Sequence, residues 1–140
     1  MPVSGKSPVI PSMRYRDAAA AIDWLCHVLG FSRHLVVPGE GNTITHAQLT
    51  LGDGMIMLGS ERDDEYGQVM VVPSPQGVNT QSAYIVVNEP QALHDRVLAA
   101  GADIVMPLQY PEYGGAFFSC RDPEGHVWNI GSYDPWQTQS

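Results

Sequence analysis

Positively charged residues are scarce in this sequence, and long apolar runs are absent. The 140 residues contain 7 Lys and Arg against 15 Asp and Glu, which gives a formal net charge of −8 at pH 7. Binding to the phosphate backbone of a nucleic acid needs clustered Lys and Arg, so we expect no nucleic-acid partner. No apolar run approaches the ~20 residues that a membrane-spanning helix requires. We therefore expect no membrane association.

Cysteine is also scarce, and the N-terminus has none of the features of a secretory signal. Cys26 and Cys120 form no CxxC motif and no dense disulfide pattern. We expect two reduced, buried thiols in a cytoplasmic protein. The opening segment MPVSGKSPVIPSM lacks the continuous apolar stretch of a signal peptide, which agrees with a cytoplasmic location.

The composition that remains is that of a globular chain. Hydrophobic residues make up 44% of the sequence and charged residues 16%, which is typical of a folded protein. A chain of 140 residues is long enough to bury one sizeable core. We expect one domain over residues 1–140.

The first half of the chain predicts a strand, a helix and three further strands. Segment 8–15 is extended, and its prolines favour an edge strand or a strand entry. Asp17 is a good helix N-cap, and Ala18, Ile22, Leu25 and Leu29 then recur at helical spacing. Gly30 is expected to end this helix. Segments 32–38, 44–52 and 54–60 alternate as strands, with a hairpin turn between the last two.

The second half repeats this order. Segment 81–88 predicts a strand, and 88–102 a helix with Pro90 in its first turn. Leu93, Val97 and Ala100 would share its apolar face, and Gly101 would end it. Segments 103–110, 116–121 and 126–133 predict three more strands. The helix-ending glycines Gly30 and Gly101 lie 71 residues apart, which sets the length of an internal repeat. Module one would span about 8–60, a linker about 61–80, and module two about 81–136.

Two βαβββ modules, together with RYRDAAAAIDWLCHVLGF (14–31) and FSCRDPEGHVWNI (118–130), resemble the vicinal oxygen chelate superfamily. That superfamily includes glyoxalase I, bleomycin-resistance and fosfomycin-resistance proteins and extradiol dioxygenases. The C-terminal GSYDPW resembles that of single-domain glyoxalase-like members of unassigned activity. The resemblance implies an α+β fold in which the two modules form a curved mixed sheet around a cavity, with helices on the convex side. The Asp-Pro-Glu-Gly turn at 122–125 would hold the last two strands in register, a structural role.

In metal-using members of this superfamily, four strands each contribute one ligand, typically His or Gln, Glu, His or Gln, and Glu. The resemblance places Ile10, Met57, Gln81 or Ser82, and Asn129 at these positions. Ile10 cannot coordinate a metal, and the thioether of Met57 is a poor ligand for the cations concerned. Gln81 would be acceptable and Ser82 weak, while Asn129 stands where Glu is expected. Because no carboxylate remains, we expect no metal and no other cofactor.

The histidines offer little support for catalysis. His27 and His94 are expected on the helix surfaces, and His126 beside the last turn and exposed. The sequence contains no HxE, HExxH or GxSxG motif. Cys120 is expected to be a buried small residue without a lowered thiol pKa. The catalytic residues are therefore unknown, and His46 is the only candidate general acid or base, although a hydrogen-bonded strand histidine is the favoured interpretation.

Strand alternation through Asn129 selects the side chains that would line the cavity. The expected ligand-binding residues are Ile10, Ser12, His46, Gln48, Met55, Met57, Ser82, Tyr84, Tyr113 and Asn129. This lining is apolar with a few polar groups, as in small-molecule sites. Tyr66 and Tyr110 could join Tyr113 in an aromatic rim. Trp128 and Ile130 would instead lie under a helix.

These observations predict a small-molecule-binding protein of the glyoxalase/bleomycin-resistance type, without a catalytic metal. Its ligand would be an antibiotic or an aromatic metabolite. Related proteins often carry an arginine at the position of Ala116, so the resemblance implies that a charged anchor for an anionic substrate is missing. Relatives of this size usually pair across a two-fold axis, which implies a homodimer.

Two other interpretations remain open. One is a metal-dependent glyoxalase-like lyase, isomerase or dioxygenase with non-standard ligands such as His46, Gln81 and Asn129. The other is a structural or regulatory domain without a small ligand, whose cavity is filled by Met55, Met57 and Trp128.

Overall fold

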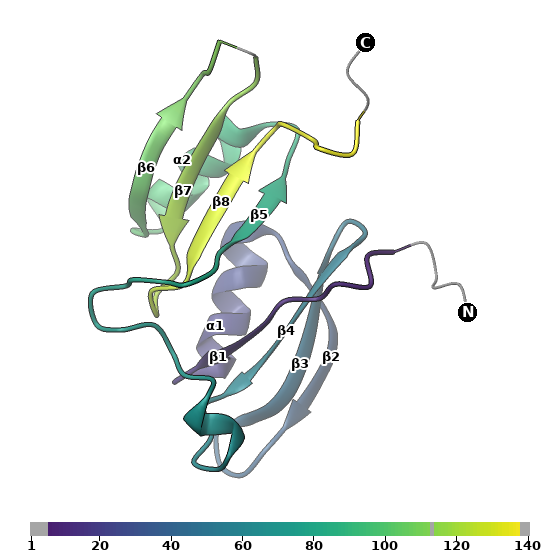
Figure 1. The fold of residues 1–140 in the computed structure, drawn as a ribbon, viewed down its shortest axis with the longest axis vertical. Helices are drawn as coiled ribbons and strands as arrows, with labels where there is room; N and C mark the ends of the chain where they lie inside the picture. Colours follow the sequence, from purple (N-terminus) through teal and green to yellow (C-terminus); the bar gives the residue numbers. More distant parts are fainter. Residues whose placement is uncertain (1–5, 113, 138–140) are drawn as a thin grey trace. The chain divides into compact units, whose positions relative to one another are not determined.

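The computed structural model describes residues 6–112 and 114–137, which form two mixed β-sheets and two α-helices (Figure 1). The chain divides into two compact units, one ending at Pro73 and the other beginning at Ser74. The elements of the first unit are β1 Ser12–Tyr15, α1 Ala18–Trp24, η1 Leu25–Leu29, β2 Ser32–Pro38, β3 Ile44–Leu51, β4 Gly54–Ser60 and η2 Tyr66–Gln68. Those of the second are β5 Ala83–Val86, α2 Pro90–Ala99, β6 Asp103–Gln109, β7 Phe117–Arg121 and β8 Val127–Gly131.

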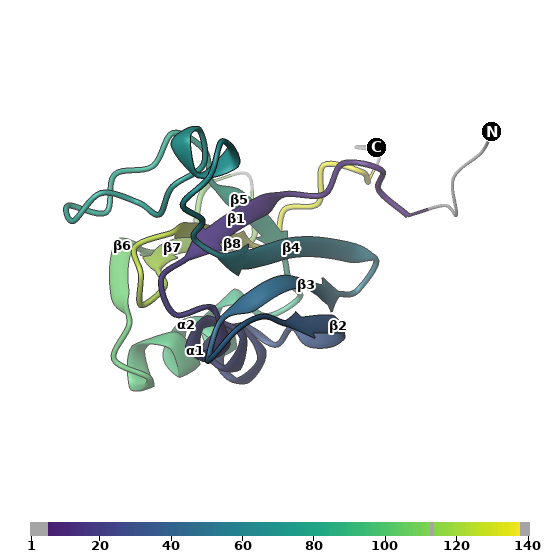
Figure 2. The same ribbon diagram turned by 90° about the horizontal axis from the view of Figure 1, so that it is seen from below.

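The two sheets have the same topology. The strand order is β1-β4-β3-β2 in the first sheet and β5-β8-β7-β6 in the second. Figure 2 shows the order of the first sheet clearly. In each sheet the first strand pairs in parallel with the last, and the other pairs are antiparallel. The predicted α+β class and the repeated strand-helix-three-strand order are confirmed. The first strand begins at Ser12 and not at residue 8, since Pro8 and Pro11 have no N–H to donate to the sheet.

The first helix follows the predicted pattern but widens at its C-terminal end. The Asp17 carboxylate accepts a hydrogen bond from the Ala20 amide at 3.1 Å and caps the helix. After Trp24 the helix continues as a π-helical turn, η1, which closes with the Gly30 amide donating to the Leu25 carbonyl. The Phe31 amide, beyond the turn, donates to the same carbonyl at 3.1 Å. The predicted stripe of Ala18, Ile22, Leu25 and Leu29 is buried. Gly30 ends the turn at φ 93°, a backbone conformation that favours glycine.

The second helix is correct in outline and differs in two details. Pro90 begins it, and Leu93 and Val97 are buried as predicted. Ala100 is exposed and is the C-cap residue, just beyond the last residue of the helix. The prediction of a surface position for His94 is also wrong. Its side chain is 17% exposed, and its ring packs edge-on against Phe118 with the ring centroids 5.2 Å apart.

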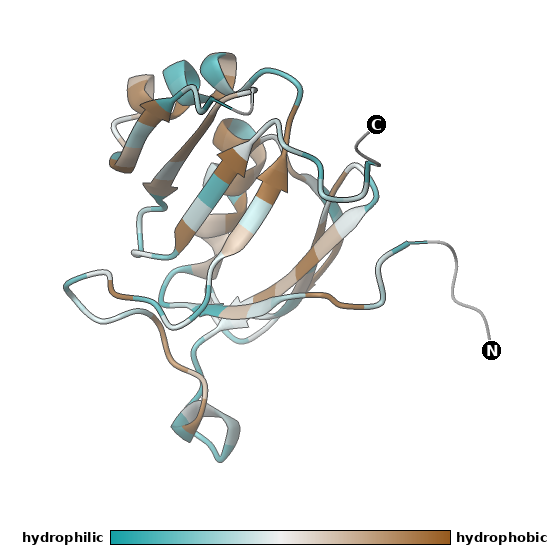
Figure 3. Ribbon diagram, turned by 45° about the horizontal axis from the view of Figure 1, so that its top comes forward, coloured by the Kyte–Doolittle hydropathy of each residue, from teal (hydrophilic) through white to brown (hydrophobic). Residues whose placement is uncertain are grey.

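Each sheet buries one face under its own helix. In the first sheet the buried side chains of β3 and β4 alternate, with Ala47, Leu49, Ile56 and Leu58 on one face. In the second sheet Phe118, Cys120, Trp128 and Ile130 do the same. Hydrophobic and hydrophilic positions accordingly mix along the strands in Figure 3. Trp128 and Ile130 thus lie on the helix-covered face, as the alternation predicts.

Acidic residues follow β4, and part of this segment has a defined local structure. Asp64 accepts hydrogen bonds from the Gly67 amide at 3.0 Å and from Arg62 Nε at 2.7 Å. The Gly67 amide, followed by the Arg62 guanidinium, lowers the pKa of the Asp64 carboxyl. Tyr66 packs close to two guanidinium groups, with Arg14 Cζ 4.9 Å and Arg62 Cζ 5.6 Å from its ring centroid. Tyr66 thus packs against arginines of its own unit.

The turn between β7 and β8 is built around a buried carboxylate. Asp122 is only 5% exposed, and it accepts hydrogen bonds from Trp128 Nε1 at 3.1 Å and from the Glu124 and His126 amides. Gly125 completes the turn at φ 96°. His126 was expected to be exposed, but it is half-buried. Its backbone amide donates a hydrogen bond to the buried Asp122 carboxylate.

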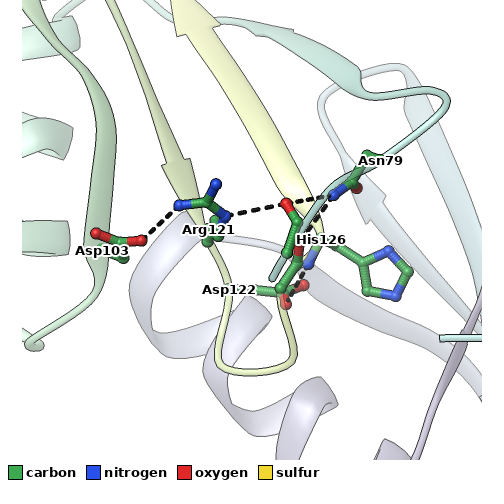
Figure 4. Close-up of polar contacts among 7 residues, drawn as sticks. Asn79, Asp103, Arg121, Asp122 and His126 are labelled. Carbon is green, nitrogen blue, oxygen red and sulfur yellow. Dashed lines mark hydrogen bonds and ion pairs between the residues drawn. The ribbon is translucent and has the colours of Figure 1, made fainter. Parts of the chain in front are cut away.

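The segment before β5 is attached to this hairpin (Figure 4). Asn79 Nδ2 donates to the Gly125 carbonyl at 2.9 Å, and its Oδ1 accepts from the Val127 amide at 3.1 Å. Arg121 Nε donates to the Gly77 carbonyl at 3.1 Å, while its Nη1 lies 2.6 Å from Asp103 Oδ2. These contacts hold residues 77–79 against the end of the sheet.

Among the helices of the described residues, none combines the length and the apolar character that crossing a membrane would require.

Candidate functional site

The second unit contains a pocket of about 320 Å³. Its lining comes from all four strands of the sheet and from the loops that follow β6 and β8. The lining residues are Tyr84, Met106, Pro111, Gly114, Ala116, Phe117, Ser119, Asn129 and Tyr133. None of these side chains carries a formal charge, so the pocket is apolar with a few hydroxyl and amide groups. This volume and this composition are typical of sites for small organic molecules.

The floor of the pocket is one row of residues that crosses the sheet. The strand register pairs Tyr84 with Asn129, Asn129 with Ser119, and Ser119 with Met106. Paired residues point to the same face of a sheet, so all four side chains face the pocket. The row therefore places two polar groups, Ser119 and Asn129, between a tyrosine and a methionine.

The hydrogen bonds of Asn129 determine which way its amide points. Its Nδ2 lies 3.2 Å from the Ala83 carbonyl oxygen and 2.7 Å from Ser82 Oγ. A carbonyl oxygen can only accept, so the amide nitrogen must face Ala83. The amide oxygen then faces Ser119, whose hydroxyl donates to it at 2.7 Å. Asn129 is thus fixed from both neighbouring strands.

Gly131 makes room for the tyrosine at one end of the row. A Cβ at this buried position would lie 2.6 Å from the Tyr84 hydroxyl oxygen and 3.2 Å from the Ala116 carbonyl oxygen. Without it, Tyr84 reaches over β8 and donates its hydroxyl proton to the Tyr133 carbonyl at 2.8 Å. The glycine therefore shapes the wall of the pocket.

The predicted ligand-binding residues fall on equivalent faces of the two sheets. In the second unit Tyr84 and Asn129 line the pocket, and Ser82 bonds Asn129. In the first unit the register pairs Ser12 with Met57 and Met57 with Gln48. The remaining predicted residues are Ile10, a half-buried residue before β1; His46 and Met55, which share the face of Gln48; and Tyr113, which lies outside the described residues.

The repeat explains why these two rows correspond. Gln48 and Ser119 lie 71 residues apart, and Met57 and Asn129 lie 72 apart. Asn129 is therefore the counterpart of Met57, and Ser119 that of Gln48. The sequence reasoning missed Ser119, Met106 and Phe117. Applying the 71-residue repeat to Gln48 would have pointed to Ser119.

The candidate acid or base lies in the first sheet. His46 is half-buried, and its Nε2 lies 3.1 Å from Gln48 Nε2. This contact agrees with a hydrogen-bonded strand histidine, and a catalytic role for His46 stays a prediction. Of the expected aromatic rim, Tyr110 donates its hydroxyl proton to Gln91 at 3.1 Å, and neither it nor Tyr66 is among the residues that line the pocket.

The two thiols are unsuited to nucleophilic attack. Cys120, on the helix-covered face of β7, is fully buried. Burial raises the pKa of its thiol to about 12, and the nearby Asp122 charge adds a smaller effect in the same direction. Cys26 was expected to be buried, but it is half-buried. Desolvation raises the pKa of its thiol as well. The nearby Arg33 lowers the Cys26 pKa and Asp23 raises it, but burial is the larger effect.

Comparison with known proteins now identifies the family. The model of the Glyoxalase/Bleomycin resistance protein/Dioxygenase superfamily matches residues 10–130, which span both units. The chain belongs to this superfamily. The resemblance seen in the repeat and in the last hairpin is thereby confirmed.

Individual proteins are similar to this chain over most of its length. The crystal structure of TioX from Micromonospora sp. ML1 is 33% identical, with a TM-score of 0.70, and covers 89% of this chain and 97% of that chain. Mb0911c from Mycobacterium bovis (strain ATCC BAA-935 / AF2122/97) is 27% identical over 131 residues, covering 94% of this chain and 86% of that protein. Lactoylglutathione lyase from Agrobacterium tumefaciens shares the fold, with a TM-score of 0.65 at 19% identity over 99% of this chain and 100% of that chain.

The side chains at the superfamily's metal-ligand positions do not fit a divalent cation. Met57 offers a thioether, which hard and borderline cations bind poorly. Asn129 has both amide protons and its amide oxygen in hydrogen bonds to neighbouring strands. In the part of the chain that the structure describes, no group of three or more His, Cys, Asp or Glu is placed to hold a metal. We therefore derive no metal-dependent step from these residues.

Proposed function

We propose that this protein binds a neutral small organic molecule, an antibiotic or an aromatic metabolite, without a catalytic metal. The observation that carries the proposal is the uncharged pocket of the second unit, whose polar floor is Ser119 and Asn129. Ala116, at the position where relatives often carry an arginine, is one of its lining residues. An aromatic ligand would lie between Tyr84 and Met106, and its polar group would face the floor.

A blocking substitution tests this proposal. Met106 lines the pocket and is 45% exposed, so Met106→Trp adds bulk there at small cost to folding. Leu98→Trp, on the exposed side of α2, is the matched control, because Leu98 is 55% exposed and is not among the lining residues. The test ligand is 2-naphthol. Its binding is measured from the NMR chemical shifts of the backbone amides of ¹⁵N-labelled, EDTA-treated protein.

The expected result is a saturable shift of the Tyr84, Ser119 and Asn129 amides in the wild type and in Leu98→Trp. In Met106→Trp we expect at least about tenfold weaker binding, equivalent to about 1.4 kcal/mol. Saturable shifts that survive in Met106→Trp, or no saturable shift in any of the three proteins, would contradict the proposal.

The alternative is a metal-dependent lyase, isomerase or dioxygenase with non-standard ligands. Elemental analysis of protein purified without chelator distinguishes it from our proposal. We expect well below one equivalent of Mn, Fe, Ni, Cu or Zn per chain, and no rise in Tm when Mn²⁺, Ni²⁺ or Zn²⁺ is added. A stoichiometric metal would favour the alternative.

We further propose that the protein is a cytoplasmic homodimer. The two free cysteines support a reducing compartment, and the net charge of −8 opposes binding to nucleic acid. Sedimentation equilibrium checks the dimer, for which we expect twice the mass of the 15.3 kDa chain.

A further inference from the structure

We infer that the pocket selects aromatic ligands that donate a hydrogen bond, such as a phenol or an indole, over ligands that can only accept one. The inference rests on the proposed binding function and adds to it the chemical class of the ligand. It comes from the direction of each hydrogen bond at the floor of the pocket.

The first step is the orientation of the Asn129 amide. The Ala83 carbonyl cannot donate, so Asn129 Nδ2 must face it, at 3.2 Å. The second proton of Nδ2 is directed to Ser82 Oγ at 2.7 Å. Both amide protons are therefore committed to β5 and to the residue before it, and neither is available to a ligand.

The second step is the direction of the Ser119 hydroxyl. Its Oγ lies 2.7 Å from Asn129 Oδ1, and the amide oxygen can only accept. Ser119 must therefore donate its single proton to Asn129. What this pair can still offer to the pocket is acceptor capacity: the lone pairs of Ser119 Oγ and one further lone pair of Asn129 Oδ1.

The third step is the cost of a mismatched ligand. Ser119 is 4% exposed and is one of the residues that line the pocket. A ligand that brings an N–H or O–H to this place forms a hydrogen bond with the pair. A ligand that brings only an ether or carbonyl oxygen places acceptor against acceptor, and its oxygen gives up hydrogen bonds to water without gaining a donor in the pocket.

The walls of the pocket determine which chemical groups suit the remainder of the ligand. Tyr84, Met106, Phe117 and Tyr133 provide apolar and aromatic contact, and no lining side chain bears a charge. A carboxylate or phosphate would find no cationic partner there and would also face the acceptor pair. The ligand class is therefore a neutral aromatic molecule with one inward-pointing donor.

Matched probes in which a methyl group replaces the donor hydrogen test the inference on the wild-type protein, and the Asn129→Leu variant below separates the effect of the lost donor from that of the added methyl group. The pairs are 2-naphthol with 2-methoxynaphthalene, and indole with 1-methylindole. The Kd of each is measured by titration of the pocket amides in NMR spectra. We expect the donor of each pair to bind at least about fivefold tighter, because one hydrogen bond is worth about 1 kcal/mol. Naphthalene-2-carboxylate should bind more weakly than either naphthalene probe.

Substitutions at the floor provide a second readout. Asn129→Leu removes the amide that orients Ser119, and we expect the donor preference to fall toward a ratio of one while 2-methoxynaphthalene still binds. Asn88→Leu, an exposed position before α2, is the matched control and should keep the wild-type ratio.

The outcomes separate the two claims. If the members of each pair bind the wild type equally, the donor inference is wrong and the proposed binding function stands. If none of the four neutral probes shifts the pocket amides, the proposed function and the inference fail together. The wild-type comparison decides the matter even if Asn129→Leu does not fold.

Discussion

At the scale of single residues, Asp122 shows how a turn residue becomes part of the core. The sequence indicates a tight turn at Asp122-Pro123-Glu124-Gly125, with a structural role, and the structure agrees. It adds that the Asp122 carboxylate is buried and serves three donors, among them the indole of Trp128. The indole nitrogen lies six residues away on β8, so this contact links the turn to the core of the sheet.

Replacing Asp122 tests this link. Asp122→Ala removes the carboxylate that accepts from the buried Trp128 N–H and from two turn amides, so the free energy of unfolding should fall by about 2–4 kcal/mol. Urea unfolding at pH 7 measures this value. The control is Asp53→Ala in the β3–β4 turn, whose side chain is 91% exposed, and its effect should stay within about 0.5 kcal/mol. Equal effects of the two substitutions would show that Asp122 contributes no more than a surface residue.

Cys120 gives the pH dependence of stability a specific sign. Its thiol pKa is raised in the folded protein from the usual 9.0 to about 12, so the unfolded chain loses this proton first as the pH rises. The stabilisation is complete below about pH 9 and is lost between about pH 9 and 12, at up to ~1.4 kcal/mol per pH unit.

Urea unfolding between pH 8 and 10.5 checks this expectation. The wild type should lose stability more steeply with pH than Cys120→Ala, whatever the difference between them at pH 8. Cys26→Ala keeps the buried thiol and should retain most of the slope of the wild type. Parallel curves for the wild type and Cys120→Ala would contradict the assignment of the slope to Cys120.

At the scale of elements, the second sheet depends on contacts from outside its strands. Asn79 bonds the backbone of Gly125 and Val127, and Arg121 bonds the Gly77 carbonyl. The sequence assigns residues 61–80 to a surface linker on composition alone. Composition cannot reveal that a single asparagine forms hydrogen bonds with two backbone groups of a hairpin more than forty residues later. Such a contact depends on the tertiary fold, which brings the two segments together.

Asn79→Ala should therefore loosen the start of β8. We expect the free energy of unfolding to fall by about 1–3 kcal/mol, since the part-buried Gly125 carbonyl and Val127 amide each lose the hydrogen bond to Asn79. Hydrogen exchange of the Val127 amide, which donates to Asn79, should accelerate more than that of the Ile130 amide at the centre of the strand. Asn42→Ala, at an exposed turn of the first unit, is the control and should change neither quantity. Unchanged protection of Val127 would contradict this role.

At the scale of the whole molecule, the net charge of the protein contrasts with the absence of charged side chains in the pocket lining. The chain carries a net charge of −8, yet the pocket lining has no charged side chain. A long-range field acts on charged ligands and has little effect on neutral ones. The protein should thus repel anions from a distance while binding neutral molecules through short-range contacts.

Ionic strength distinguishes these two effects. The Kd of 2-naphthol should change by less than about twofold between 20 and 300 mM NaCl, because neither the ligand nor the lining is charged. Binding of naphthalene-2-carboxylate should become stronger over the same range, as salt screens the repulsion. A strong salt dependence for 2-naphthol would indicate a charged group in the site.

The sequence by itself determined the order of the elements, the internal repeat and the two buried faces. These follow from local rules: Asp17 and Pro90 begin helices, Gly30 and Gly101 end them, and alternation separates Trp128 from Asn129. The repeat and the last hairpin also pointed to the superfamily. Such signals lie within a few residues of one another or recur at a fixed distance, so they can be read along the chain.

Only the tertiary structure decided which side chains line the pocket. Ser119 and Met106 join Tyr84 and Asn129 through the register of four strands, and register is set by partners far away in the chain. The direction of the Asn129 amide depends in turn on the Ala83 carbonyl of the neighbouring strand. The resemblance puts Asn129 at a position expected to hold glutamate in metal-using members, and the strand register places this asparagine against Ser119, whose hydroxyl donates to the Asn129 amide oxygen.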